Sequence, residues 1–102
     1  MELEIRIGDI DSDEALRAYL RRHIRFALGR FSRSIRRVTV RVTEGRVAGG
    51  RVEMECRIAV RLISEGRVDL IERAPTLQAA LDGGIERLRR TMMRRIGGNR
   101  SP

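Results

Sequence analysis

The longest alternation of apolar and polar residues in this chain lies between residues 51 and 63. Its apolar members occupy every second position: Val52, Met54, Cys56, Ile58, Val60 and Leu62. Because successive side chains of a β-strand point to opposite faces, this spacing predicts a strand with one buried and one solvated face. Similar alternations at 2–7, 36–43 and 68–74 predict three more strands, each with one apolar face. The fold is therefore expected to contain a sheet that is covered on one side only.

Two other stretches have helical spacing. The first follows Ser12, a suitable N-cap, and the second follows Pro75 and the cap Thr76. The apolar stripe of the first is expected to comprise Ala15, Leu16, Tyr19, Leu20, His23, Ile24, Ala27, Leu28 and Phe31. That of the second is expected to comprise Leu77, Ala80, Leu81, Gly84, Ile85, Leu88, Met92 and Ile96. Gly97 and Gly98 are expected to end the second helix.

The predicted order of elements is β-α-β-β-β-α. Since each strand has one apolar face, this is an α+β fold with a four-stranded sheet and two helices packed on one face, as in double-stranded-RNA-binding domains. A right-handed crossover makes the first two strands parallel, and the last three strands form an antiparallel meander. We expect residues 1–98 to form a single domain that binds RNA or ribosomes, and residues 99–102 to form a frayed C-terminal tail.

Charge is segregated along the chain, which has a formal net charge of +8. Residues 15–43 contain nine arginines and no acid, and residues 87–102 contain six arginines and no acid. A solvated surface usually mixes the two signs. On both predicted helices the arginines fall opposite the apolar stripe, so adjacent helices are expected to merge them into one cationic surface suited to a phosphate backbone. Arg30, Arg33, Arg36 and Arg37, nearby in the chain, are expected to extend this surface. The candidate RNA-binding arginines are Arg17, Arg21, Arg22, Arg25, Arg30, Arg33, Arg36, Arg37, Arg87, Arg90, Arg94 and Arg95.

Catalytic chemistry has little support in this sequence. His23 lies on the core side of its helix, and Cys56 alternates inward with valine and isoleucine. Glu53 and Glu55 lie on the solvated strand face, where they are expected to form salt bridges. The pair Gly83–Gly84 lies within a helix, where small residues allow close packing. We therefore expect no enzyme activity, no cofactor, no metal site and no small-molecule substrate.

The mode of RNA recognition can also be narrowed. The aromatic residues Tyr19 and Phe31 lie on the predicted core side of the first helix, and none lies on the exposed sheet face. A stacking platform for single-stranded bases is therefore not expected, and recognition of backbone and shape remains. No stretch approaches the ~20 apolar residues of a membrane span, and the N-terminus does not resemble a signal peptide. We expect a cytoplasmic protein that needs no stable oligomer.

Two motifs resemble those of a known family. The run DSDEALRAYLRRH at 11–23 is similar to D-I-T-E-A-L-R-x-Y-V-x-K-K, and AALD at 79–82 resembles part of the box D-x-Y-x-A-I-D. Both patterns are typical of the ribosome hibernation-promoting and ribosome-associated inhibitor family, also called sigma-54 modulation proteins, in its short form. Thr76 and Gln78 stand where that family usually has Asp and Tyr.

The resemblance implies a translation inhibitor that docks on rRNA in the mRNA–tRNA channel of the small ribosomal subunit and silences idle ribosomes. It places Arg22 and His23 on the paired lysines of the family, which makes His23 a further candidate RNA-binding residue. It places Arg87, Arg90 and Arg94 on basic positions of the last helix, and it implies that Tyr19 and Asp82 hold the helices together. Two alternatives remain: a general module for structured RNA, or a protein-interaction and assembly factor that uses an exposed sheet edge.

Overall fold

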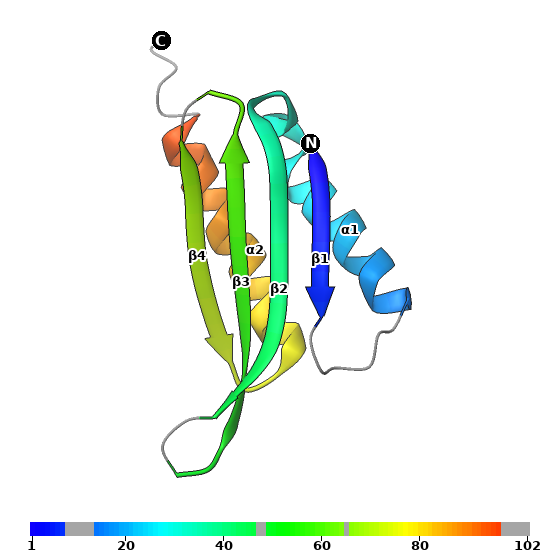
Figure 1. Cartoon of the computed structure of the whole chain (residues 1–102), viewed down its shortest axis with the longest axis vertical. Helices are drawn as coiled ribbons and strands as arrows, with labels where there is room; N and C mark the ends of the chain where they lie inside the picture. The colour runs from blue at the N-terminus through cyan, green and yellow to red at the C-terminus, as the bar shows by residue number, and fades with distance from the viewer. Residues whose placement is uncertain (8–13, 47–48, 65, 97–102) are drawn as a thin grey trace.

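The computed structural model describes residues 1–7, 14–46, 49–64 and 66–96. The order of elements follows the prediction (Figure 1), with one additional 3-10 helix, η1. The elements are β1 (Glu2–Ile7), α1 (Glu14–Leu28), η1 (Gly29–Ser34), β2 (Ile35–Arg46), β3 (Val52–Leu62), β4 (Arg67–Ala74) and α2 (Leu77–Arg95). The predicted cap Ser12, the stop at Gly97–Gly98 and the tail 99–102 lie outside the described residues.

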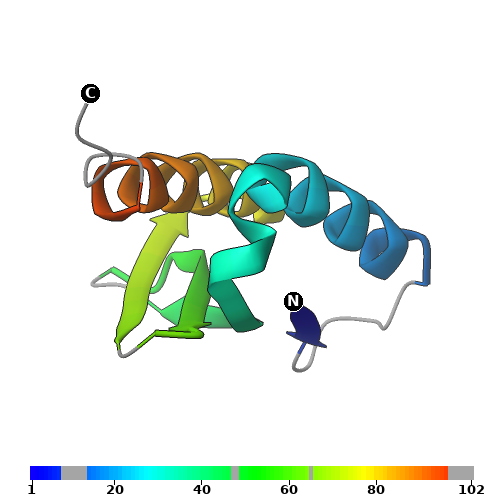
Figure 2. The same cartoon turned by 90° about the horizontal axis from the view of Figure 1, so that it is seen from above.

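The four strands form one sheet in the order β1-β2-β3-β4. β1 runs parallel to β2, and the β2–β3 and β3–β4 pairs are antiparallel, as predicted. The register places Val40 opposite both Ile5 and Ile58, and Ile58 opposite Leu70. Apolar side chains therefore share one face of the sheet, and both helices lie against that face (Figure 2). The predicted α+β fold is confirmed.

The core lies between the helices and the sheet. Leu20, Ile24 and Leu28 of α1 are fully buried there, as are Leu81 and Leu88 of α2. Burying a side chain of this size stabilises the fold by about 1.5–3 kcal/mol relative to leaving it exposed, so this one layer supplies most of the driving force for folding. The apolar residues whose spacing predicted the helices and strands are thus largely the residues that are buried in the core.

Three details differ from the expectation. Phe31 is buried, but it lies in η1 rather than in α1, because the α-helix ends at Leu28, before Gly29. Val52 was expected to point into the core and is 47% exposed, since it lies at the end of a β2–β3 hairpin that extends past the helices (Figure 1). Ala15 was also expected inward and is exposed in the first turn of α1. No described helix is long and apolar enough to cross a bilayer.

Helix α2 is seated closely on the sheet. Thr76 caps its N-terminus, since the Thr76 hydroxyl accepts a hydrogen bond from the Ala79 amide at 3.2 Å. Gly84 is buried on the underside of the helix, where an added Cβ would lie 3.3 Å from Cδ1 of Ile58 and 3.4 Å from Sγ of Cys56. The prediction that a glycine in this helix allows close packing is therefore confirmed at Gly84.

Candidate nucleic-acid interface

The outward faces of the two helices carry arginines that form no ion pair with the residues the structure describes. Arg21, Arg22 and Arg25 on α1 are exposed and make no hydrogen bond or ion pair with the rest of the described chain. Arg90 on α2 likewise forms no hydrogen bond or ion pair with the described residues, although its charge helps to lower the pKa of Glu86 on the same helix. Among the described residues, Arg94 forms a hydrogen bond only with the Thr91 hydroxyl of its own helix, at 3.4 Å. These side chains keep all or nearly all of their donors available to a ligand. We call them, together with Arg30 and Arg33, the helix-face arginines.

Three other candidate arginines are used by the fold itself. Arg17 donates to the carbonyl oxygen of Ile5 in β1 at 2.8 Å. Arg87 donates to the carbonyl oxygen of Ile71 in β4 at 3.0 Å, and Arg95 donates to a second carbonyl of the same strand at 3.1 Å. β1 and β4 are the outermost strands of the sheet, whose exposed backbone groups would otherwise invite pairing with another chain. These three arginines, called here the edge arginines, therefore engage one backbone carbonyl of β1 and two of β4.

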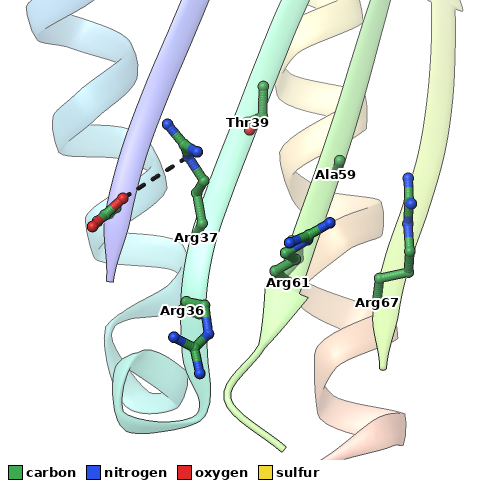
Figure 3. Close-up of a pocket in the computed structure, with 8 residues that line it drawn as sticks. Arg36, Arg37, Thr39, Ala59, Arg61 and Arg67 are labelled. Atoms are coloured by element: carbon green, nitrogen blue, oxygen red, sulfur yellow. Dashed lines mark ion pairs between the residues drawn. The ribbon is translucent and has the colours of Figure 1, made fainter. Parts of the chain in front are cut away.

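Arg36 and Arg37 do not extend the helix surface as expected. Both lie on β2 and line a hollow on the opposite, exposed face of the sheet (Figure 3). Arg30 and Arg33 do lie beyond the end of α1, in η1, and the Arg30 guanidinium lies 5.5 Å from the ring centroid of Phe31. The predicted single cationic surface is thus divided into the helix-face arginines, the edge arginines and a group on the sheet face.

A polar cluster joins the two helices. The Gln78 side-chain amide donates to the Tyr19 hydroxyl at 2.9 Å and to both carboxylate oxygens of Asp82 at 3.0 Å. The Tyr19 hydroxyl also lies 3.4 Å from Asp82, to which it can donate. Tyr19 and Asp82 therefore hold α1 and α2 together, as the resemblance implied. Gln78 completes this cluster in the position where the family usually has Tyr.

His23 lies in the seam between the helices rather than on their outer face. Its side chain is 34% exposed, and the ring of Tyr19 meets it edge to face, with 5.5 Å between the ring centroids. Nδ1 of His23 is buried without a hydrogen-bond partner, 3.9 Å from a carboxylate oxygen of Asp82. His23 can therefore reach an RNA ligand only across the open side of this seam.

The seam continues as a groove of about 650 Å³ that contains an aromatic residue missed by the sequence reasoning. Phe26 of α1 lines this groove and is 90% exposed, and Arg30 of η1 and Arg89 of α2 line the same groove. Glu86 pairs with Arg89 at 2.7 Å, so the groove itself is mixed in charge. The signal in the sequence was a phenylalanine placed out of phase with the apolar stripe. Such a ring can stack on an unpaired base.

The exposed face of the sheet is held together largely by ion pairs. Glu55 receives Arg57 at 2.8 Å and Arg73 at 3.0 Å. The hydrogen bond from Arg57 is the main cause that holds the pKa of the Glu55 carboxyl below its usual range. The expected salt bridges are therefore confirmed at Glu55, whereas Glu53 forms none with the described residues.

The inward position of Cys56 is confirmed. Its side chain is fully buried, and this burial, with Glu72 nearby, raises the pKa of the thiol to about 12. A thiol in that state is a poor nucleophile at neutral pH. Within the described part of the chain, no three His, Cys, Asp or Glu side chains are grouped so as to hold a metal ion.

The family model described as "Sigma 54 modulation protein / S30EA ribosomal protein" matches residues 3–97. The chain belongs to this family. No curated protein sequence matches it.

Two solved structures share the fold. One is the N-terminal domain of Protein Y from Thermus thermophilus, with a TM-score of 0.72 and 22% identity, covering 92% of this chain and 98% of that one. The other is a ribosomal subunit interface protein from Coxiella burnetii, with a TM-score of 0.78 and 10% identity, covering 93% of this chain and 97% of that one. Because the sequence identities are low, these two structural similarities support the fold of this chain and no more.

Proposed function

We propose that this protein binds the small ribosomal subunit through the helix-face arginines and inhibits translation while bound. The observation that carries the proposal is a set of arginines on α1 and α2 that face solvent and form no ion pair with the acidic residues that the structure describes. Charges left unpaired on one side of a domain are suited to an external polyanion, and rRNA is the polyanion of the ribosome. The chain belongs to a family whose description includes a ribosomal protein, and this supports the ribosome as the partner.

The proposed inhibition of translation requires only binding to the ribosome and no catalytic step. The polar cluster between α1 and α2 fixes the relative positions of the two helices, so the arginines are presented on a rigid surface. A rigid cationic surface loses little conformational entropy on binding phosphates and associates rapidly through electrostatic steering. In the mRNA–tRNA channel, which the family resemblance points to, the bound protein would exclude mRNA and tRNA by occupying their site. This role places its action in the cytoplasm.

Phe26 adds a contact that arginines cannot provide. Its exposed ring lines the groove between the helices, as does Arg30. An unpaired rRNA base that enters the groove would stack on this ring, and each stacked base typically contributes about 1–3 kcal/mol. Phosphate contacts would then position the protein, while Phe26 would favour a site that offers an unstacked base.

Charge reversal on the helices tests the proposal. The variant Arg22→Glu/Arg90→Glu is compared with Arg41→Glu/Arg51→Glu, which changes the net charge equally but away from the helices. All four arginines are exposed and form no hydrogen bond or ion pair with the described residues. Losing two charge-assisted contacts should weaken binding to purified small subunits by about a hundredfold or more, and it should restore translation in an inhibition assay. The control should retain both activities.

Other outcomes would identify the alternatives. Equal affinity for naked duplex RNA and for the small subunit would indicate a general module for structured RNA. Association that survives nuclease treatment of a lysate would indicate a protein partner. A partner that pairs with a sheet edge would have to compete with Arg17 and Arg87, each of which binds a backbone carbonyl of an edge strand.

A further inference from the structure

Three arginines form a row across the exposed face of the sheet, away from the helices. Arg37 on β2 lies opposite Arg61 on β3, and Arg61 lies opposite Arg67 on β4. Residues paired in this way have Cβ atoms about 4.5–5.5 Å apart, and like charges directly opposite each other destabilise a sheet. This arrangement calls for negative charge to offset the repulsion.

The fold supplies that negative charge to the two outer arginines only. Arg37 pairs with Glu4 at 2.9 Å, and Arg67 pairs with Asp69 at 2.7 Å. Arg61, between them, makes no ion pair or hydrogen bond with any residue that the structure describes. The outer guanidinium groups are therefore held in place, while the central one keeps all its donors free.

A β-bulge adds a fourth arginine to this row. The register between β2 and β3 shifts between Ile35 and Arg37, so that Arg36 is an extra residue without an opposite partner. Val38 is buried and Arg37 is exposed, so a regular strand would turn Arg36 toward the core. The bulge instead leaves Arg36 exposed, next to Arg37. Bulges commonly redirect a side chain in this way beside functional sites.

The four arginines surround a hollow of about 410 Å³ (Figure 3). Its lining comprises Glu2, Arg36, Arg37, Thr39, Ala59, Val60, Arg61 and Arg67. Thr39 and Ala59 are paired across β2 and β3, and their small side chains leave space beside the longer arginines. The lining has one carboxylate against four guanidinium groups, and the Thr39 hydroxyl offers a further donor.

We propose that this hollow binds backbone phosphates of an RNA segment, as a second contact site on the face opposite the helices. Guanidinium forks match phosphate oxygens in a bidentate geometry. The row spans two strand spacings, roughly 10 Å, which favours a polymer with successive phosphates over one small anion. The lining contains no aromatic ring on which a base could stack, so the backbone phosphates are the part of an RNA that it suits. A protein bound at both faces would contact two RNA segments at once.

Removing the central charge tests this site. Arg61→Gln is compared with Arg41→Gln, a matched loss of an exposed arginine without an ion pair on the same sheet face. Both substitutions are introduced into the Arg22→Glu/Arg90→Glu variant, so that the helix-face arginines contribute little to the measured RNA affinity. The readouts are the affinity for a fluorescent RNA hairpin at low salt and the amide chemical shifts of the sheet. Inorganic pyrophosphate and a polyglutamate peptide serve as alternative probes.

Arg61→Gln is expected to weaken RNA binding by about tenfold and to abolish RNA-induced shifts at the floor of the hollow. Arg41→Gln should change the affinity less than about twofold. The urea midpoint of Arg61→Gln should stay equal or rise, because like-charge repulsion in the row is relieved. Equal losses in both variants would overturn the site, and pyrophosphate or polyglutamate binding as tightly as RNA would overturn its assignment to an RNA backbone. These readouts use naked RNA, so they do not depend on whether the helix face binds ribosomes.

Discussion

The two adjacent glycines of α2 allow one chemical change to be tested in two environments. At Gly84, the added Cβ of an alanine would lie 3.3 Å from Ile58 and 3.4 Å from Cys56, and both of these side chains are buried. At Gly83, the nearest atom is Cγ of Glu72 at 3.2 Å, and that side chain is 31% exposed and can rotate away. The same methyl group therefore meets a closed core at one position and a movable chain at the other.

The expected free energies follow from these contacts. Replacing glycine by alanine within a helix contributes about 1 kcal/mol of stability in both variants. Overpacking a core costs about 1–3 kcal/mol, so Gly84→Ala should be destabilised by about 1 kcal/mol overall. Gly83→Ala should be stabilised by about 0.5 kcal/mol, because only a surface side chain must move.

Thermal and urea unfolding of the two variants measure this difference directly. A gap of about 1.5 kcal/mol corresponds to roughly 6–12 °C between their melting temperatures for a domain of this size. Helix propensity is nearly the same at the two positions, so it cancels in the comparison. If the two variants were equally stable, α2 would not be seated on Ile58 and Cys56 as the structure has it.

Further expectations concern single side chains. Arg17→Ala should lower the free energy of unfolding by about 1 kcal/mol in urea titrations, because the bond to the β1 edge is lost, whereas Arg22→Ala should change it by less than about 0.5 kcal/mol; a larger loss for Arg22→Ala would contradict its free, outward position. Cys56 should resist alkylation in the native protein at pH 7 to 9, since its thiol has a pKa of about 12, and rapid labelling would show that the thiol is accessible. Phe26→Ala should leave the melting temperature nearly unchanged and weaken binding to small subunits by about 1–3 kcal/mol; unchanged binding would exclude stacking on this ring.

Most of the fold could be predicted because its core is periodic. Val40 and Ile58 alternate with polar neighbours, and Leu20 and Ile24 repeat at helical spacing, so the pattern reports burial directly. The β2–β3 hairpin was less predictable. Val52 follows the alternation of its strand, yet it lies beyond the helices that cover the sheet, and only the lengths of the elements in space decide that.

The candidate site was predictable in composition and less so in arrangement. Arg22 and Arg90 could be placed on outer faces from helical spacing alone. Arg17 and Arg87 could not be recognised as edge contacts, because long side chains reach strands that only the tertiary structure brings near. The predicted position of Arg36 near the helices is wrong. A β-bulge turns Arg36 to the exposed face of the sheet, and this bulge depends on a register shift that the sequence does not mark.

The central claim is that the helix-face arginines bind rRNA phosphates. The decisive measurement is the salt dependence of the affinity for purified small ribosomal subunits, in the wild type and in Arg22→Glu/Arg90→Glu. Each neutralised phosphate releases condensed counterions, so five or six engaged arginines should give a log–log slope of about −4 to −5 in the wild type. The variant should have a slope shallower by about 2, because two phosphate contacts are lost. An equally steep slope in both proteins, or a shallow slope shared by both, would show that the helix face is not the surface that binds.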